Sequence, residues 1–221
     1  FAFPAGTGDL RKIVEALDAY QRERGQALAF QCVTREQFAQ LEALFPGRFQ
    51  IEYDRDYADY VYDAEKLANL SGKKYHGKKN HVNKFQKQYP DWSYEPMTAD
   101  NLEDCFQMAL IWRRENGCEE DVEKNAEMCV ALNALRLFTE LSMEGGVLRV
   151  GGEVVAFTLG EQACEDTFVV HIEKARADID GAYTMINQQF VQHALLGKYK
   201  YVNREDDVGA EGLRKAKLSY H

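Results

Sequence analysis

The residues best suited to acid–base chemistry lie in the last quarter of the chain, close behind apolar runs. Glu173 follows one such run, and Glu205 and Asp206 follow the next. A carboxylate can act as a general base, and Tyr220 and His171 are candidate proton donors. Because sites in α/β sheets form outside strand ends, we expect these groups to contribute to a catalytic site.

Cations accompany these carboxylates. Arg204, Arg214, Lys215 and Lys217 lie within a short charged segment and are suited to neutralising a phosphate. Each residue also has an ordinary structural interpretation. The Arg/Lys set can complement the dipole of a C-terminal helix, while Glu173 can belong to a surface ion pair.

The stretch 166–194 predicts a strand, a turn containing glycine and a helix. The N–H groups that begin a helix, together with its dipole, can hold an anion. Gly181, Ala182 and Tyr183 are therefore candidate donor-binding residues. Asp180 can instead cap the helix itself. An ordinary packing unit remains the alternative.

A basic segment stands out in a chain whose net charge is −9. Residues 71–90 contain six lysines and no acid, and helical spacing places apolar and basic residues on different faces. The segment is either a solvated helix face or a surface for phosphate, a nucleic-acid backbone or a lipid headgroup. The candidate surface residues are Lys73, Lys74, Lys78, Lys79, Asn80, His81, Asn83 and Lys84, within the helix that continues to Lys87.

The elements that must position these residues alternate between helices and strands, which predicts an α/β (α+β) fold. Local signals include an N-cap at Asp9, a capping box from Thr34 to Gln37 and a hairpin turn at Gly151-Gly152. The expected helices are 10–24, 35–44, 63–70, one within 71–90, 98–116, 119–143, 183–196 and one carrying Arg214. The expected strands are 27–33, 49–53, 57–62, 92–95, 147–150, 154–159, 167–172 and 200–202.

Composition sets limits on the class of protein. A hydrophobic content of 45% and a charged content of 29% are typical of a globular domain, and no apolar run approaches the ~20 residues of a membrane span. Five scattered cysteines without a C-x-x-C predict reduced thiols, and the histidine spacing predicts no metal site. We therefore expect a cytoplasmic protein. Because the first residue is Phe, we also expect an N-terminal truncation.

Two motifs narrow the fold. The segment from Leu70 to Lys74 followed by Asn80–Lys84 resembles the phosphatidylglycerol lysyltransferase C-terminal domain family, as does Tyr199–Asn203 with Gly209. The order of elements from Gly146 onward is similar to the core of the GNAT acyltransferases. The resemblance is to a soluble bacterial group of uncharacterised function built from tandem GNAT-like domains. It implies that residues 1–62 end a first, incomplete GNAT-like domain and that 63–221 form a second, complete one.

The resemblance also implies a chemistry. An aminoacyl group would pass from aminoacyl-tRNA, or an acyl group from acyl-CoA, to an unidentified acceptor, with no tightly bound cofactor and no metal. Glu173, Glu205, Asp206 and Tyr220 would be catalytic. Gly181, Ala182, Tyr183, Arg204, Arg214 and Lys217 would bind the donor. The Lys73–Lys87 helix would contact tRNA or an anionic lipid headgroup.

A second function stays open, because Asp178 and Tyr183 depart from the acyl-CoA signature of the GNAT enzymes. The chain would then be a non-catalytic module that binds an anionic ligand or metabolite. An open gap on either side of the strand 167–172 would favour the enzyme. Side chains that fill such a gap would favour the module.

Overall fold

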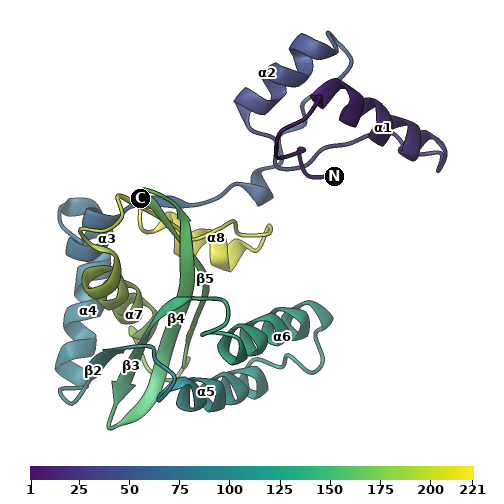
Figure 1. Ribbon diagram of the computed structural model, residues 1–221. Coiled ribbons are helices and arrows are strands. Elements are labelled where there is room, and N and C mark those ends of the chain that lie inside the picture. Colours follow the sequence, from purple (N-terminus) through teal and green to yellow (C-terminus); the bar gives the residue numbers. More distant parts are fainter. The chain divides into compact units, whose positions relative to one another are not determined.

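The computed structural model describes all 221 residues, which form two compact units, Phe1–Tyr57 and Ala58–His221 (Figure 1). The first unit contains helices α1 (Leu10–Arg22) and α2 (Arg35–Leu44) and the short 3-10 helix η1 (Arg55–Tyr57). Its small core is centred on Val14, Leu41 and Phe45.

Both predicted caps in the first unit are confirmed. The Asp9 side chain accepts a hydrogen bond from the Lys12 N–H at the start of α1. Thr34 and Gln37 form the reciprocal bonds of a capping box at the start of α2, at 2.9 and 3.2 Å. These signals are confirmed because each depends on residues no more than three positions apart.

The strands predicted at 27–33 and 49–53 are wrong. Neither segment forms a strand, and the first contributes only an isolated parallel bridge between Gln31 and Ala2. A strand needs a neighbour that satisfies its backbone groups along its length. These segments find apolar contacts instead, since Leu28, Phe30 and Phe49 pack against the core of the unit.

The second unit is built on one six-stranded sheet with the order β1-β6-β5-β4-β3-β2. Every neighbouring pair is antiparallel except β5 and β6, which are parallel. The strands are β1 (Val61–Asp63), β2 (Ser93–Pro96), β3 (Glu144–Val150), β4 (Glu153–Cys164), β5 (Thr167–Ala175) and β6 (Tyr201–Asn203). The predicted hairpin at Gly151-Gly152 is confirmed as the β3–β4 turn.

Helices cover both faces of this sheet, with α3, α4 and α7 on one side and α5 and α6 on the other (Figure 1). The α/β class is thereby confirmed. The helical segments are α3 (Ala64–Asn69), η2 (Lys73–Tyr75), α4 (His76–Gln88), α5 (Leu102–Glu115), α6 (Val122–Arg136), α7 (Ala182–Phe190), the π-helical turn η3 (Val191–Leu195) and α8 (Glu211–Leu218). The helix predicted for 119–143 ends at Arg136, before turns that include Ser142 in the left-handed region at φ 52°.

A β-bulge in β5 shifts the alternation of its side chains, so residues after the bulge point to the opposite face of the sheet from the one that regular alternation would give. Leu159 pairs with Ile172 while Gly160 pairs with Val170, so His171 is an extra residue on β5. Val170 packs in the core beneath α7, whereas Ile172 packs in the core beneath α5 and α6. Because of the bulge, the Glu173 side chain lies on the face of the sheet that α7 covers. Without the bulge it would point to the opposite face.

We predict that Gly160→Ala destabilises the protein by about 2 kcal/mol. A Cβ on Gly160 would lie 1.9 Å from the Val169 carbonyl oxygen, so β4 and β5 would have to separate at the bulge. Urea denaturation followed by circular dichroism measures the effect. Gly77→Ala is the matched control, because a Cβ there meets nothing within 4 Å and alanine favours the helix α4. Equal stability of the two variants would contradict the prediction.

Candidate functional site

The parallel strands β5 and β6 diverge after three paired positions. Thr167, Phe168 and Val169 pair with Tyr201, Val202 and Asn203, after which β6 ends while β5 continues to Ala175. Side chains fill the region between the far end of β5 and the loop that follows β6. Polar side chains from both segments meet there.

An ion pair between Glu173 and Arg204 bridges the divergence. Arg204 Nη2 donates to Glu173 Oε1 at 2.8 Å, and the two side chains are only 12% and 9% exposed. Asn187, on α7, donates from Nδ2 to the other Glu173 oxygen at 3.3 Å. Two residues predicted from separate stretches of sequence are thus in direct contact.

Tyr220 closes the same space and is 4% exposed. Burial is the main reason why the pKa of this phenol is raised, and the nearby Arg204 charge opposes the rise. The Arg204 guanidinium lies 5.2 Å from the centroid of the Tyr220 ring, and the Tyr62 ring packs edge-on at 6.0 Å. Glu173, Arg204 and Tyr220, all predicted site residues, therefore form one cluster.

Lys78 is a fourth member of this cluster. Its ammonium lies 4.0 Å from the centroid of the Tyr220 ring, and burial followed by the nearby Arg204 charge lowers the pKa of Lys78. From the sequence, Lys78 was predicted to be one of several surface lysines. The spacing of Lys78 could have indicated its position. It lies three residues after Tyr75 and four before Val82, both of which are buried, so it shares their face of the helix.

Lys217 and Arg214, predicted to bind a donor, are both bonded within the protein. The Lys217 ammonium donates to the carbonyl of Arg204 at 2.5 Å and also to the carbonyls of Glu205 and Asp206. Arg214 forms a bidentate pair with Asp207 at 2.7 and 2.8 Å. These contacts hold the loop after β6, and donor binding by either side chain stays a prediction.

Glu205 and Asp206 lie outside the buried cluster. Glu205 Oε1 is 2.7 Å from Nδ1 of His171, the bulged residue, and Glu161 Oε1 is 3.3 Å from Nε2 of the same ring. The Glu205 hydrogen bond is the main reason why the pKa of His171 is raised. Asp206 accepts a hydrogen bond from the Val208 N–H within the loop. Their catalytic assignment remains untested.

The turn before α7 differs from the expectation that Asp180 caps the helix. Gly181 is the N-cap at φ 85°, no side chain caps the helix, and Asp180 forms an ion pair with Lys84 of α4 at 2.5 Å. Asp178 is paired with Arg176 at 2.8 and 3.0 Å. Both carboxylates are thus neutralised by cations beside the turn.

Gly181 also packs closely against α4, because a Cβ there would lie 3.1 Å from the His81 carbonyl oxygen. Ala182 begins α7 and is buried, whereas Tyr183 is 42% exposed. Burial is the main reason why the pKa of the Tyr183 phenol is raised. Tyr183 therefore does not join the cluster of Glu173 and Arg204.

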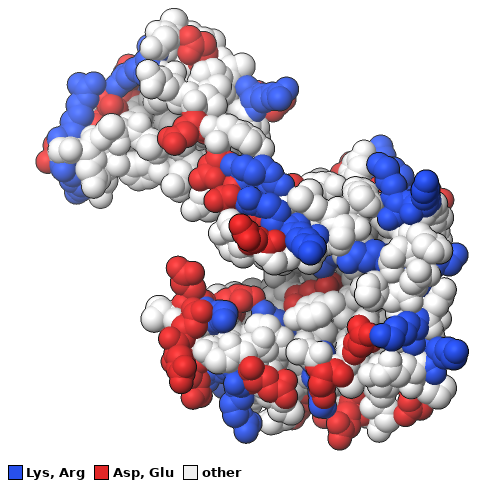
Figure 2. Space-filling model, turned by 180° about the vertical axis from the view of Figure 1, so that it is seen from behind, with Lys and Arg blue, Asp and Glu red and all other residues white.

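The basic surface predicted on α4 is exposed apart from Lys78, which is half-buried. Figure 2 shows Lys and Arg atoms gathered over the flank of α3 and α4, and acidic atoms over the opposite flank formed by α6. The exposed polar residues of this flank are Lys73, Lys74, Lys79, Asn80, His81, Asn83 and Lys84.

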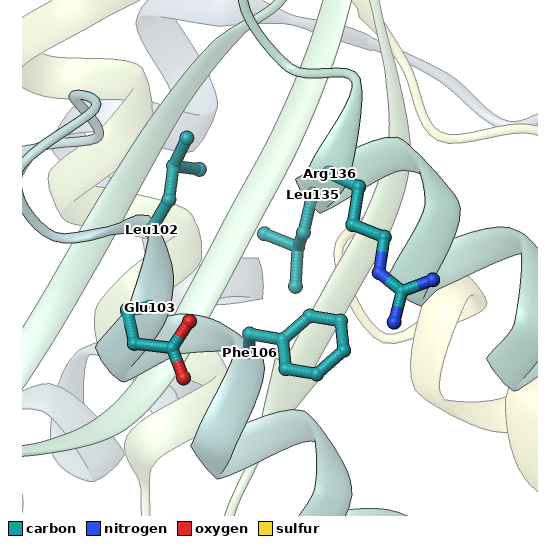
Figure 3. A pocket seen from close by; sticks show the side chains of 5 residues that line it. All are labelled: Leu102, Glu103, Phe106, Leu135 and Arg136. Atoms are coloured by element: carbon teal, nitrogen blue, oxygen red, sulfur yellow. The ribbon is translucent and has the colours of Figure 1, made fainter.

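A separate pocket lies on the other side of the sheet, between α5 and α6 (Figure 3). The Arg136 guanidinium lies 5.1 Å from the Phe106 ring centroid there. Leu102, Glu103 and Leu135 complete the lining. None of the predicted site residues lines this pocket.

Features that would support other classes of site are not found. No three His, Cys, Asp or Glu side chains are placed to hold a metal ion, and all five cysteines are free. None of the helices combines the length and the apolar character needed to cross a bilayer.

The sheet is an antiparallel meander followed by a parallel strand–helix–strand unit, within an α/β fold. The family model for the phosphatidylglycerol lysyltransferase C-terminal region matches residues 1–221. The chain belongs to that family, as the two sequence motifs predicted.

Solved structures agree with this fold. A conserved protein of unknown function from Bacteroides thetaiotaomicron is 42% identical, with a TM-score of 0.90 over 98% of this chain and 73% of that one. The C-terminal domain of a putative lysylphosphatidylglycerol synthetase from Agrobacterium fabrum is 14% identical, with a TM-score of 0.67 over 100% of this chain and 72% of that one. L-PGS from Bacillus licheniformis is 16% identical, with a TM-score of 0.60 over 99% and 72%. The last two share the fold.

A curated relative also matches. An uncharacterized protein from Mycoplasmoides gallisepticum is 25% identical over 166 residues, which cover 73% of this chain and 52% of the relative. The chain thus spans about half the length of that relative.

We predict that Glu205→Gln lowers the pKa of His171 toward the ordinary value of about 6.5. The decrease should be larger than in Glu161→Gln, because Glu205 makes the shorter hydrogen bond with the His171 ring. The pKa of His171 is raised in the folded state, so its protonated ring stabilises the fold. This contribution to stability is complete below the unfolded-state pKa and is lost as the pH rises through the folded-state pKa. NMR titration of the His171 ring protons measures this. An equal shift in both variants would count against it.

Proposed function

We propose that this protein transfers an aminoacyl group from aminoacyl-tRNA to an acceptor that carries a hydroxyl or an amine. The observation that carries the proposal is the buried cluster of Glu173, Arg204 and Tyr220 at the divergence of the parallel strands, in a chain of this family. The cluster provides a carboxylate, a guanidinium and a phenol within contact of one another. Acyl-CoA is the second donor we consider.

The chemistry needs three functions. The acceptor attacks the ester carbonyl, a new ester or amide bond forms, and the bond to the ribose oxygen of the tRNA breaks. Glu173 takes the proton from the acceptor, and Arg204 stabilises the negative charge that develops on the carbonyl oxygen. Tyr220 donates a proton to the ribose oxygen that leaves. No tightly bound cofactor is needed.

The exposed lysines of η2 and α4 would bind the donor. A polyanionic tRNA is attracted to a basic surface even when the net charge of the protein is negative, because phosphate contacts are local and salt-dependent. Lys73, Lys74 and Lys79 are all exposed on the flank of α3 and α4. An anionic lipid headgroup is the other partner suited to this surface.

The second function, a non-catalytic module that binds an anion, is favoured by one specific observation. Side chains fill the divergence between β5 and β6, where Arg204 contacts Glu173 and Tyr220 is buried. We expected a filled gap in a binding module and an open gap in an enzyme. The transfer assay below distinguishes the two functions.

We predict that Glu173→Gln reduces aminoacyl transfer by about 100-fold or more, because the amide cannot accept the proton. Transfer of a radiolabelled amino acid from tRNA to acceptors in a cell extract measures the rate. Tyr220→Phe, which removes only the hydroxyl, should reduce transfer without removing the ring. Glu65→Gln, at an exposed carboxylate on α3, is the matched control.

Thermal melts must accompany this assay, because Glu173 neutralises the buried Arg204. A folded Glu173→Gln variant with wild-type transfer would exclude Glu173 as the base. Wild-type protein that binds the donor but transfers nothing would favour the binding module.

We predict that replacing Lys73, Lys74 and Lys79 together by alanine weakens tRNA binding equally for every tRNA. The slope of log K against log salt should fall in magnitude by about 1 for each phosphate contact removed. Filter binding at several salt concentrations measures this, and Lys124→Ala, at an exposed lysine on α6, is the control on another surface. A loss of binding to phosphatidylglycerol vesicles, with tRNA binding unchanged, would assign the surface to lipid instead.

A further inference from the structure

Two cations converge on one neutral ring in the cluster between β5 and the loop after β6. The Lys78 ammonium and the Arg204 guanidinium lie 4.0 and 5.2 Å from the centroid of Tyr220. Glu173 is the only carboxylate that pairs with either cation, and it pairs with Arg204. Lys78 is thus half-buried without a carboxylate partner, and the charge of the cluster is positive.

Two buried polar atoms of the cluster have no hydrogen-bond partner. One is Nη1 of Arg204, a charged donor, and the other is Oδ1 of Asn187, an acceptor. Their side chains flank the same Glu173 carboxylate. An unpaired buried polar atom costs about 1–3 kcal/mol, so a group that satisfies it is strongly favoured.

Tyr220 is a weak partner for these cations. A ring over a cation contributes about 0.5–2 kcal/mol, whereas an oxyanion forms charge-assisted hydrogen bonds with ammonium and guanidinium groups. Most backbone bonds of the segment that carries Tyr220 are local, since the N–H groups of Ser219, Tyr220 and His221 donate to carbonyls three or four residues earlier. The His221 carbonyl accepts one bond from Tyr75 at 3.3 Å, and the Ser219 hydroxyl bonds only within the segment.

We propose that this space is a binding pocket for an oxyanion, held by Lys78 and Arg204, and that the Tyr220 side chain occupies it until the ligand displaces it. The ligand carries a phosphate or a carboxylate. The pocket shares Arg204 and Tyr220 with the proposed transfer site but needs no group transfer, so the anion titration tests it separately. It also gives a reason why Tyr220 fills the divergence.

The test is a calorimetric titration of the whole chain with inorganic phosphate and, separately, with acetate, at constant ionic strength. Tyr220→Ala should bind the preferred anion about tenfold more tightly than the wild type, because the competing ring is gone. Lys78→Met should bind it about tenfold more weakly. Lys124→Met, at an exposed lysine on α6, should leave the affinity unchanged.

Amide NMR spectra of the wild type provide a second measurement that needs no core substitution. The signals of Ser219, Tyr220 and His221 should shift and saturate as the preferred anion is added. Tighter binding of phosphate assigns the pocket to a phosphate, and tighter binding of acetate assigns it to a carboxylate. The proposal is overturned if neither anion shifts these signals, or if the shifts are unchanged in Lys78→Met.

Discussion

The ion pair between Glu173 and Arg204 joins two strands at the point where they stop sharing backbone hydrogen bonds. β5 and β6 are paired over only three positions, so beyond Val169 the ion pair replaces the ladder between them. Glu173 faces Arg204 because the bulge at His171 changes the alternation of β5, and the bulge in turn requires the close approach of Gly160 to Val169. A constraint on one glycine thus determines which side chains enter the site.

The loop that carries Arg204 is positioned by the C-terminal helix. The Lys217 ammonium binds successive carbonyls of this loop, which includes Glu205 in the left-handed region at φ 56°. The Asp207 carboxylate, buried and paired with Arg214, anchors the other end, and this partner holds the pKa of Asp207 well below its usual range. Lys217 and Arg214, which were predicted to bind the donor, therefore form bonds that hold this loop.

The sequence predicted what is local and missed what depends on distant partners. The caps at Asp9 and Thr34 follow from neighbouring residues, and of the charged residues after Asn203 only Arg204 lies in the cluster with Glu173. The bulge was missed because it depends on the approach of another strand. The orientation of Lys78 was missed because six lysines in one segment suggested a single solvated surface.

A buried ion pair is weak evidence for a stabilising role, because apolar residues of similar volume are often as stable in its place. The Glu173–Arg204 pair is also incompletely satisfied, since Arg204 Nη1 lacks a partner, and a second cation lies nearby without a carboxylate. A core selected only for stability would not keep these features together. They are the features of a site that is completed by an anion, and the buried Tyr220 ring covers the Arg204 guanidinium until that anion arrives.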